Sequence, residues 1–474
     1  MSKKRVLFAT SEVSPYMATG GMGQVVAALP QALVSAYASR YDVAIVCPLY
    51  EPVKRRYSGE LTFLGATTAK LAWRDQYVGV YSATRDGVMY YFVDNLQYFG
   101  RERAYGYFDD GERFAFFCKA VFSVIEFTGF HPDVIHAHDW QSALVPLYLR
   151  TRFADKYSGI RSVLTIHNLE YQGQFAPHTL SDVFDLYESE RSLVDWNGCV
   201  NLLKGAIVTC DRLTTVSPSY AQEIREYGGH GLEPILRENA YKLTGIINGI
   251  DTELYDPATD KALYRNYSAD SPSEKFSNKR KLRDMFGLRQ NPQTPVICVV
   301  SRLVAHKGID LITQIAEDLA EMDLQFVLLG TGDHYFETYF RAWAAEHPGK
   351  VGINISYSTE TASLIFAGSD ITLMPSLSEP CGLTQMISCR YGTIPIVRET
   401  GGLKDTIRDC RLGDGNGFLF PHYNAAELLY TIRKALELYS APDTWSKLTQ
   451  EAMRSDFSWK SSADAYAAIY EELL

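Results

Sequence analysis

Residues 296–308 have the sequence VICVVSRLVAHKG, and this stretch decides the fold. Residues 296–300 are an apolar run rich in β-branched side chains, which predicts a buried β-strand, and the residues after Gly308 continue into a helical pattern. A strand that leads through a short turn into a helix is the repeating unit of parallel sheets covered by helices. The stretch therefore predicts an α/β fold.

The same alternation of strand and helix continues toward the C-terminus. Further strands are predicted at 326–329, 353–356, 371–374 and 394–397, and a helix is expected after each of the first four strands of this series. On the N-terminal side, residues 256–294 are polar, with several prolines and a basic stretch at 279–283. Such a change in composition predicts a domain junction.

The N-terminal half shows the same pattern. Strands are predicted at 6–10, 43–48, 134–137, 163–166 and 213–216, with helices such as 112–127 between them. One antiparallel hairpin is expected where 77–83 and 88–93 flank Asp86 and Gly87, a favoured turn pair. The chain thus predicts two doubly wound sheets. Because ligands bind beyond the carboxyl ends of such strands, we expect the two domains to share one interdomain cleft.

Length and composition exclude several classes of protein. The chain has 474 residues, enough for two or three domains, and its 46% hydrophobic and 22% charged residues are typical of globular proteins. The formal net charge of -10 disfavours nucleic acid as a partner. No apolar run approaches the ~20 residues that cross a bilayer, and the run at 6–9 is too short for a signal peptide. We therefore expect no membrane partner. The 8 cysteines are scattered without a CxxC pair, so we expect a reduced, cytoplasmic protein.

The turn inside the opening stretch carries two cations. Arg302 offers a planar fork of donors and Lys307 a point charge, a combination suited to a diphosphate. A cap exposed to solvent is the alternative interpretation. Because both cations follow a strand at the edge where an open sheet binds its ligand, we favour a binding role.

Two other turns between a strand and a helix have binding chemistry. The Glu379 carboxylate can accept hydrogen bonds from two adjacent sugar hydroxyls, and the N–H groups after it can donate to phosphate oxygens. Cys381 is interpreted as a buried packing residue, because no histidine is paired with it in the sequence. The glycine-rich turn 19–23, before a helix predicted at 24–34, either admits an anion closely or is a simple tight turn. It lacks the GxGxxG pattern, which disfavours a dinucleotide-dependent oxidoreductase.

Histidines end two predicted strands of the first half. We expect the side chains of His136 and His138 to point to opposite sides of their strand, which disfavours a metal site. His167 and Asn168 follow the next strand and suit hydrogen bonding to hydroxyl groups. A purely structural histidine is the alternative for His167.

These motifs and others together resemble those of bacterial glycogen synthases and plant starch synthases. The resemblance extends over almost the whole chain and is carried by Ser11, Glu12, Pro15, 19–21, Phe99, Arg101, 105–106, 136–140, 165–168, 171–173, 216–218, 248–251, 301–308, 330–333, 379–385, 390–393 and 400–403. It implies the GT-B fold of retaining glucosyltransferases, which has two Rossmann-like domains that face a cleft. The implied parts are an acceptor-side domain at 1–250, a sugar-nucleotide domain at 251–455 and a C-terminal helix at 456–474 that packs back on the first domain.

The resemblance also implies an activity and its residues. Glucose would pass from ADP-glucose, or less readily UDP-glucose, to the non-reducing end of an α-1,4-glucan such as glycogen or starch, without a metal or other cofactor. The implied catalytic residues are Arg302, Lys307, Glu379, His167 and Asp139. The implied substrate-binding residues are Thr19, Gly20, Gly21, Tyr105, Asn168, Asn248, Cys381, Gly382, Leu383 and Thr384. If the source is photosynthetic, the plastid stroma replaces the cytoplasm as the expected location.

The first glycine-rich motif departs from the family pattern. The family has a lysine and an aspartate where this chain has Ala18 and Gln24, so a contact to the donor's phosphate and one beside its sugar are both absent. The alternative to an active synthase is therefore a weak or inactive homologue that binds glucan or assists the initiation of its synthesis. Since both charges are replaced together, the local charge sum is unchanged and the fold is expected to tolerate the replacements.

Overall fold

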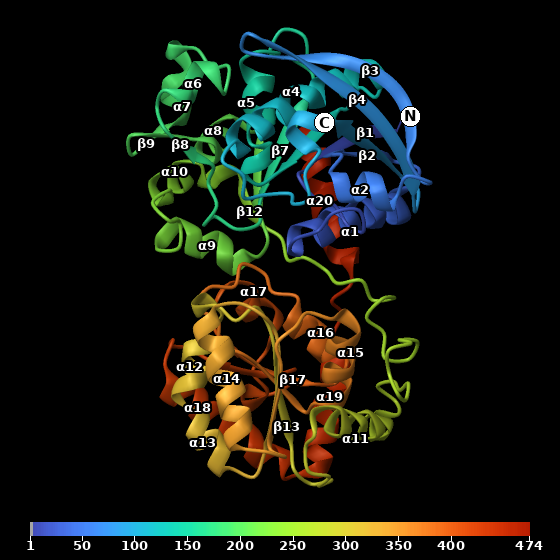
Figure 1. Ribbon diagram of the computed structural model, residues 1–474, viewed down its shortest axis with the longest axis vertical. Helices are drawn as coiled ribbons and strands as arrows, with labels where there is room; N and C mark the ends of the chain where they lie inside the picture. Colours follow the sequence, from blue (N-terminus) through green and yellow to red (C-terminus); the bar gives the residue numbers. More distant parts are fainter. Residues whose placement is uncertain (1–2) are drawn as a thin grey trace. The chain divides into compact units, whose positions relative to one another are not determined.

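The computed structural model describes residues 3–474, and the chain divides into two compact units (Figure 1). Unit 1 comprises Met1–Gly249 and Trp459–Leu474, and unit 2 comprises Ile250–Ser458. Residues 1 and 2, which belong to the first predicted domain, lie outside the described residues. The last helix of the chain is therefore part of the same unit as the N-terminal strand.

Over the described residues, unit 1 is built on a nine-stranded sheet with the order β12-β11-β7-β6-β1-β2-β5-β4-β3. The strands are β1 (Lys4–Ala9), β2 (Tyr41–Pro48), β3 (Thr62–Leu71), β4 (Arg74–Arg85), β5 (Val88–Asp94), β6 (Val134–His138), β7 (Arg161–Ile166), β11 (Arg212–Thr215) and β12 (Leu243–Gly245). All neighbours from β12 to β5 pair in parallel, whereas β4 pairs antiparallel with both β5 and β3. The parallel part contains the apolar runs that the sequence predicts as strands, because such strands are buried on both faces.

The antiparallel part contains the predicted hairpin and one strand that the sequence pattern does not predict. Asp86 and Gly87 join β4 to β5 with φ angles of 51° and 76°, as a two-residue hairpin turn requires. The unpredicted strand is β3, which lies at the sheet edge and buries only Ala69 and Leu71. Its mostly exposed side chains provide no apolar run by which the strand could be found.

Helices cover the sheet of unit 1, and the last of them is the C-terminal helix of the chain. They are α1 (Gly21–Tyr37), α2 (Glu51–Arg56), α3 (Leu96–Phe99), α4 (Asp110–Thr128), α5 (Leu144–Arg150), α6 (Thr179–Asp182), α7 (Arg191–Val194), α8 (Leu202–Thr209), α9 (Pro218–Glu226), α10 (Glu233–Glu238) and α20 (Trp459–Leu473). The α20 helix packs against α1, and its Tyr470 hydroxyl lies 2.8 Å from Nδ1 of His136 on β6. The C-terminal helix thus contacts the central strands of the N-terminal sheet.

Unit 2 has a six-stranded, fully parallel sheet with the order β15-β14-β13-β16-β17-β18 among its described residues. The strands are β13 (Val296–Val300), β14 (Gln325–Leu329), β15 (Val351–Asn354), β16 (Ile371–Met374), β17 (Ile394–Arg398) and β18 (Phe418–Phe420). Counted from β13, this is the 3-2-1-4-5-6 order of the Rossmann fold. Its topological switch point lies between β13 and β16, so the turn of residues 301–308 lies where such sheets bind ligands.

A helix follows each of β13, β14, β15 and β16, as the sequence predicts. The helices of unit 2 are α11 (Lys275–Phe286), α12 (Ile309–Gln314), α13 (Ala316–Glu321), α14 (His334–Glu346), α15 (Thr359–Gly368), α16 (Thr384–Arg390), α17 (Gly401–Thr406), α18 (Ala425–Tyr439) and α19 (Pro442–Arg454). The predicted α/β fold with two doubly wound sheets is therefore confirmed.

Some predicted boundaries are wrong, and one strand of unit 2 is not predicted. The strand predicted at 353–356 is β15 at Val351–Asn354, because the apolar run begins at Val351. The helix predicted from residue 24 begins at Gly21, so Gly21 and Gly23 are helical and the turn is shorter than expected. The strand β18 is not predicted, since a three-residue strand has too short a pattern.

The polar stretch before β13 contains a helix with buried cations. Nζ of Lys275 on α11 donates hydrogen bonds to the carbonyl oxygens of Phe366, Ala367 and Tyr391 at 2.7–3.0 Å. Burial lowers the pKa of the Lys275 ammonium to about 7. Because Phe366 and Ala367 lie in the last turn of α15, the lysine completes hydrogen bonds that a helix end leaves open. Lys275 therefore ties α11 to the C-terminal ends of α15 and α16.

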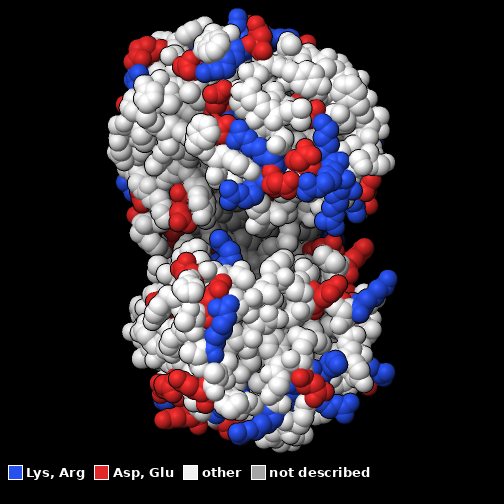
Figure 2. Space-filling view, in the orientation of Figure 1, with Lys and Arg blue, Asp and Glu red and all other residues white. Residues whose placement is uncertain are grey.

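Charged side chains are distributed over both units. On the face that Figure 2 shows, basic and acidic side chains are interspersed on each unit.

None of the helices in residues 3–474 is long and apolar enough to cross a membrane.

Gly330, directly after β14, lies so close to the backbone of Ser301 that no residue type with a Cβ atom would fit at this position. A Cβ atom on Gly330 would lie 1.9 Å from the carbonyl oxygen of Ser301. We expect Gly330→Ala to lower the free energy of unfolding by about 3 kcal/mol or more, because both clashing groups belong to the backbone. Chemical denaturation monitored by circular dichroism measures the change.

Gly287→Ala is the matched control for this prediction. Gly287 has a φ of 64°, but a Cβ there would meet nothing within 4 Å, so only left-handed strain of about 1 kcal/mol is expected. Equal losses in the two variants would contradict the role of the close approach.

Candidate functional site

The turns at the carboxyl ends of β13 and β16 are locked against each other. Gly308 ends the turn after β13 with a φ of 73°, and a Cβ there would lie 2.0 Å from the carbonyl oxygen of Pro375 in the turn after β16. The Leu377 N–H donates to the carbonyl of His306 at 2.9 Å. Because the backbones touch, the side chains of the two turns have little freedom relative to each other.

This contact brings together two of the predicted catalytic residues. Nζ of Lys307 lies 2.8 and 2.7 Å from the two oxygens of the Glu379 carboxylate. The hydroxyl of Ser376 donates a third hydrogen bond to Glu379 at 3.0 Å. The side chains of Lys307 and Glu379 are only 19% and 9% exposed, so each charge depends on the other for compensation.

Arg302, the other predicted cation of this turn, is exposed. Within the described part of the chain, its guanidinium takes part in no hydrogen bond or ion pair. Its donors are therefore available to an anion from solution. Since Arg302 follows β13 at the switch point, the anion it meets would lie at the ligand-binding edge of the sheet.

The turn that begins α16 offers backbone donors beside this cluster. Gly382 has a φ of 74°, and the N–H groups of Gly382, Leu383 and Thr384 donate to no acceptor among residues 3–474. The side chain of Gln385 fixes the turn by donating to the carbonyls of Cys381 and Gly382 at 3.0 and 2.9 Å. Cys381 is buried, as the sequence analysis predicts.

In unit 1, the start of α1 is partly satisfied by the chain itself. The Glu12 carboxylate accepts hydrogen bonds from the N–H and hydroxyl of Thr19 at 2.7 and 2.6 Å and from the N–H of Gly23 at 3.2 Å. Burial raises the pKa of Glu12, while these hydrogen bonds oppose the rise. The donors of Thr19 are thus used internally, whereas Gly20 and Gly21 are exposed and have space for a ligand.

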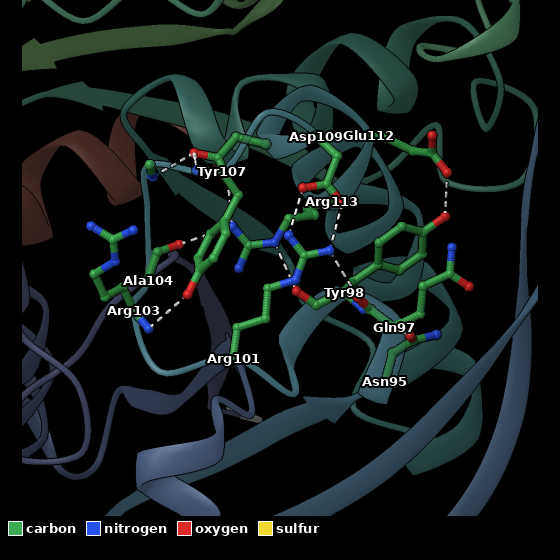
Figure 3. Close-up of polar contacts among 12 residues, drawn as sticks. Asn95, Gln97, Tyr98, Arg101, Arg103, Ala104, Tyr107, Asp109, Glu112 and Arg113 are labelled. Atoms are coloured by element: carbon green, nitrogen blue, oxygen red, sulfur yellow. Dashed lines mark hydrogen bonds and ion pairs between the residues drawn. The ribbon is translucent and has the colours of Figure 1, made fainter.

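Tyr105 lies between Ala104 and Tyr107 in the chain, on a segment that arginine side chains hold in place; Figure 3 shows the contacts of Arg101 and Arg113. The Tyr105 hydroxyl lies 2.7 Å from that of Ser11, and burial raises the pKa of Tyr105 well above its usual value. Arg101 forms two hydrogen bonds with the Asp109 carboxylate, and Nε of the buried Arg113 donates to the Tyr98 carbonyl at 2.7 Å. These contacts fix the segment on both sides of Tyr105.

Asp139 and His167 meet at the carboxyl ends of β6 and β7. The Asp139 carboxylate accepts a 2.7 Å hydrogen bond from the His167 N–H, and desolvation raises its pKa to about 7. Asp139 also has a φ of 55°, a strained value for a non-glycine residue. Desolvation lowers the pKa of His167 to about 3, so the imidazole is neutral.

The expectation that His136 and His138 point to opposite sides of β6 is wrong. Side chains two residues apart on a strand share a face, and the two rings stack with centroids 4.3 Å apart. Nδ1 of His138 lies 3.0 Å from Nε2 of His167, and Nε2 of His136 lies 2.6 Å from the Thr165 hydroxyl. Both nitrogens of His136 have protein partners, since Nδ1 faces Tyr470.

The two predicted asparagines have different surroundings. Oδ1 of Asn168 accepts a hydrogen bond from the Glu170 N–H at 3.0 Å, and the residue is partly exposed. Asn248 is buried, and its Oδ1 has no hydrogen-bond partner among the described residues. Glu12 and Ser376 complete the two sites, yet composition and spacing assign them no role. A carboxylate shortly before a glycine-rich turn is the signal that identifies Glu12.

The described residues contain one cluster of three side chains close enough to share a metal ion. It consists of Glu317, Glu346 and His347 and is mostly exposed. None of its members follows a strand at the carboxyl edge of either sheet. Such exposed acidic groups are common without an ion.

Comparisons with known proteins match both units. Residues 5–238 match the starch synthase catalytic domain family, and residues 281–452 match the glycosyl transferases group 1 family. The glycogen synthase of Geobacillus thermodenitrificans is 45% identical over 99% of this chain and 98% of its own length. The glycogen synthase of Bacillus cereus strain Q1 is 43% identical over 99% of both chains.

Solved structures give the same result. The catalytic domain of starch synthase IV from Arabidopsis thaliana, bound to ADP and acarbose, is 32% identical with a TM-score of 0.91 and covers 100% of this chain and 99% of its own. Sucrose-phosphate synthase from Thermosynechococcus elongatus, at 17% identity and a TM-score of 0.63 over 99% of both chains, shares the fold. The fold is that of a GT-B glycosyltransferase. The chain belongs to the family of glycogen and starch synthases, as the sequence motifs predict.

The ion pair between Lys307 and Glu379 should contribute to stability. We expect Lys307→Ala to lower the free energy of unfolding by about 1–3 kcal/mol, because it leaves the largely buried Glu379 carboxylate without its cation. Adding Glu379→Gln should restore at least half of the loss, since the amide carries no charge. Denaturant unfolding of the single and double variants tests this, and a double variant less stable than Lys307→Ala would contradict it.

The buried histidines should make stability fall in acid. Burial lowers the pKa of His136 to about 3, so the folded state stays neutral while the unfolded state takes up a proton below pH ~6.5. The stabilisation is therefore present above that pH and is lost as the pH falls, by about 2 kcal/mol per such histidine between pH 7.5 and 5. His136→Gln should reduce the measured loss by about this amount.

Comparing the pH dependence of unfolding in wild type and His136→Gln separates the effect of His136 from that of other titratable groups. Asp139, whose pKa is raised to about 7, acts in the opposite direction but is common to both proteins. Identical pH dependence of the unfolding free energy in wild type and His136→Gln would show that His136 does not stay neutral in the fold.

Proposed function

We propose that this chain transfers glucose from ADP-glucose to the non-reducing end of an α-1,4-glucan with retention of configuration. The observation that carries the proposal is the position of Arg302, Lys307 and Glu379 at the switch point of the unit 2 sheet. Relatives named glycogen synthase, and the starch synthase IV structure with ADP and acarbose, support these substrates. UDP-glucose is the secondary donor.

Catalysis in this proposal depends on neutralising the leaving group. The bond between C1 of glucose and the β-phosphate oxygen breaks, the acceptor hydroxyl oxygen bonds to C1 on the same face, and its proton passes to the departing phosphate. Negative charge grows on the diphosphate as the bond breaks. Arg302 has free donors for that charge, and Lys307 supplies a second cation, so the reaction requires no metal or other cofactor.

The ion pair of Lys307 and Glu379 is exchanged for contacts with the donor. The diphosphate attracts the Lys307 ammonium, and the Glu379 carboxylate is then free to accept hydrogen bonds from adjacent hydroxyls of glucose. The N–H groups of Gly382, Leu383 and Thr384 donate to phosphate oxygens. Each charge released by the exchange finds a new partner, so neither is left buried alone.

We assign the acceptor side and the transferred glucose to unit 1. His167 is neutral, so it acts as a hydrogen-bonding group and not as an acid. Asn168 has a partly exposed amide for the same role, and Asp139 orients the His167 backbone through its hydrogen bond. The remaining binding residues are Gly20, Gly21, Tyr105 and the buried Asn248. Thr19 contributes by fixing the shape of the turn.

The replacements at Ala18 and Gln24 do not disturb the fold of α1. Both side chains are exposed, so neither leaves a buried charge without a partner. The comparisons do not support the alternative that the chain is an inactive homologue. All 8 cysteines are free, which supports the proposed location in the reducing cytoplasm.

The proposal is tested by incubating the protein with labelled ADP-glucose and glycogen. We expect label in the polymer that β-amylase releases as maltose, because that enzyme cleaves α-1,4 bonds from non-reducing ends. Arg302→Ala should lower kcat/KM by roughly 30- to 1000-fold, which corresponds to about 2–4 kcal/mol of lost transition-state stabilisation.

Arg433→Ala is the matched control, since Arg433 is exposed on α18 and pairs weakly with Asp318 at 3.5 Å. It should retain wild-type kcat/KM. Failure of wild type to label glycogen from ADP-glucose or UDP-glucose would overturn the proposed function. Equal activity of Arg302→Ala and wild type would overturn the role of this cation.

A further inference from the structure

Unit 1 contains a cavity that lies apart from the candidate functional residues. It has a volume of about 610 Å³ and lies among β3, α4 and the segment after α5. None of the predicted site residues lines it. Its size is within the range of small-molecule sites in proteins.

The topology separates this cavity from the carboxyl ends of the central strands. The residues from α4 that line it, which include Lys119, Ser123 and Glu126, belong to the second half of that helix. Because a short connection leads from α4 into β6, the C-terminal half of α4 lies toward the amino end of β6. Asp139 follows the opposite, carboxyl end of the same strand.

The cavity wall has an excess of positive charge. Lys70, Lys119, Arg152 and Lys156 line it, against the carboxylates of Glu126 and Asp185. Glu190, which is outside the lining, forms hydrogen bonds of 2.7 and 2.6 Å with Arg152. Even with Glu190 counted, one cation remains uncompensated.

Two of these cations have donors to spare. Lys70 has no hydrogen bond or ion pair within the part of the chain that the structure describes. Nζ of Lys119 donates one hydrogen bond, to Asp185 at 2.6 Å, and lies 4.1 Å from the centre of the Tyr148 ring. The Lys119 side chain is only 5% exposed, so its remaining N–H groups can be satisfied only from the cavity.

The geometry of this wall is built by strained and buried groups. Asp185 has a φ of 50°, and its carbonyl accepts hydrogen bonds from Nε and Nη2 of Arg152 at 2.9 and 2.6 Å. Arg152 also stacks on Tyr187, 4.0 Å from the ring centre. Strain of this kind persists only where surrounding contacts enforce it.

Part of the remaining lining is aromatic. The rings of Phe122 and Phe153 are 4.2 Å apart, and that of Tyr157 lies 5.6 Å from Phe122. An apolar floor beside unsatisfied cations suits a ring that carries an anionic group.

We propose that this cavity binds a phosphate monoester of a small cyclic compound, either a sugar phosphate or a nucleoside monophosphate. The phosphate accepts hydrogen bonds from Lys70 and Lys119, with the positive charge of Lys156 and Arg152 nearby. The ring rests against Phe122 and Phe153. A phosphate monoester suits the site because the carboxylates of the wall neutralise only part of its four cations, and the ester brings a charge of about −2 to balance the rest.

Calorimetric titration of the full chain tests the proposal, with glucose 1-phosphate, AMP, inorganic phosphate and uncharged maltose as probes. At least one of the two esters should bind, more tightly than inorganic phosphate, and maltose should not bind in this cavity. Lys70→Glu should weaken ester binding at least tenfold, while Lys70→Arg should stay within threefold of wild type. Lys70 is exposed, so both variants should fold.

Variants elsewhere distinguish this cavity from the proposed transfer site. Ester binding should persist in Arg302→Ala, and Lys434→Glu, a charge change on α18 in unit 2, should have no effect. Transfer from ADP-glucose should be unchanged in Lys70→Glu when no ester is present. Because calorimetry measures binding and not transfer, failure of the proposed function leaves this test intact. Ester binding that is lost in Arg302→Ala but kept in Lys70→Glu, or no ester binding at all, would overturn the proposal.

Discussion

The backbone contact between the turns after β13 and β16 is the constraint on which the candidate donor site depends. Gly308 has room for no side chain, because a Cβ would lie 2.0 Å from the Pro375 carbonyl oxygen. Gly401 approaches the Glu379 carbonyl in the same way, with 2.1 Å to a would-be Cβ. Parallel strands place their carboxyl ends at one edge, and glycine allows the turns there to touch. The resulting rigidity places Lys307 beside Glu379.

Charge compensation is the second principle that organises the molecule. Lys307 and Glu379 neutralise each other where water is largely excluded, and Glu12 satisfies the start of α1 in unit 1. Lys275 uses a buried ammonium to join the ends of two helices of unit 2. In each case a charge is stable inside because neighbouring groups supply its hydrogen bonds. Arg302 and Lys70 differ, since both are exposed and without partners among the described residues.

The sequence predicts strands best where they are buried on both faces. The strands β13 and β16 begin and end where their apolar runs do, because a parallel strand in the middle of a sheet has no polar face. The edge strand β3 escapes prediction, since its exposed side chains break the pattern. The polar composition before β13 hides α11, whose lysines are buried by contacts that lie more than 90 residues away in the chain.

The sequence by itself determined the fold class, the family and the identity of the candidate site residues, because strand patterns and glycine-rich turns are local properties. Only the tertiary structure decided how those residues are paired. Lys307 and Glu379 are 72 residues apart, and their ion pair arises from the adjacency of β13 and β16. The shared face of His136 and His138, the capture of Thr19 by Glu12 and the cationic cavity beside α4 likewise depend on packing between distant segments, which no local pattern encodes.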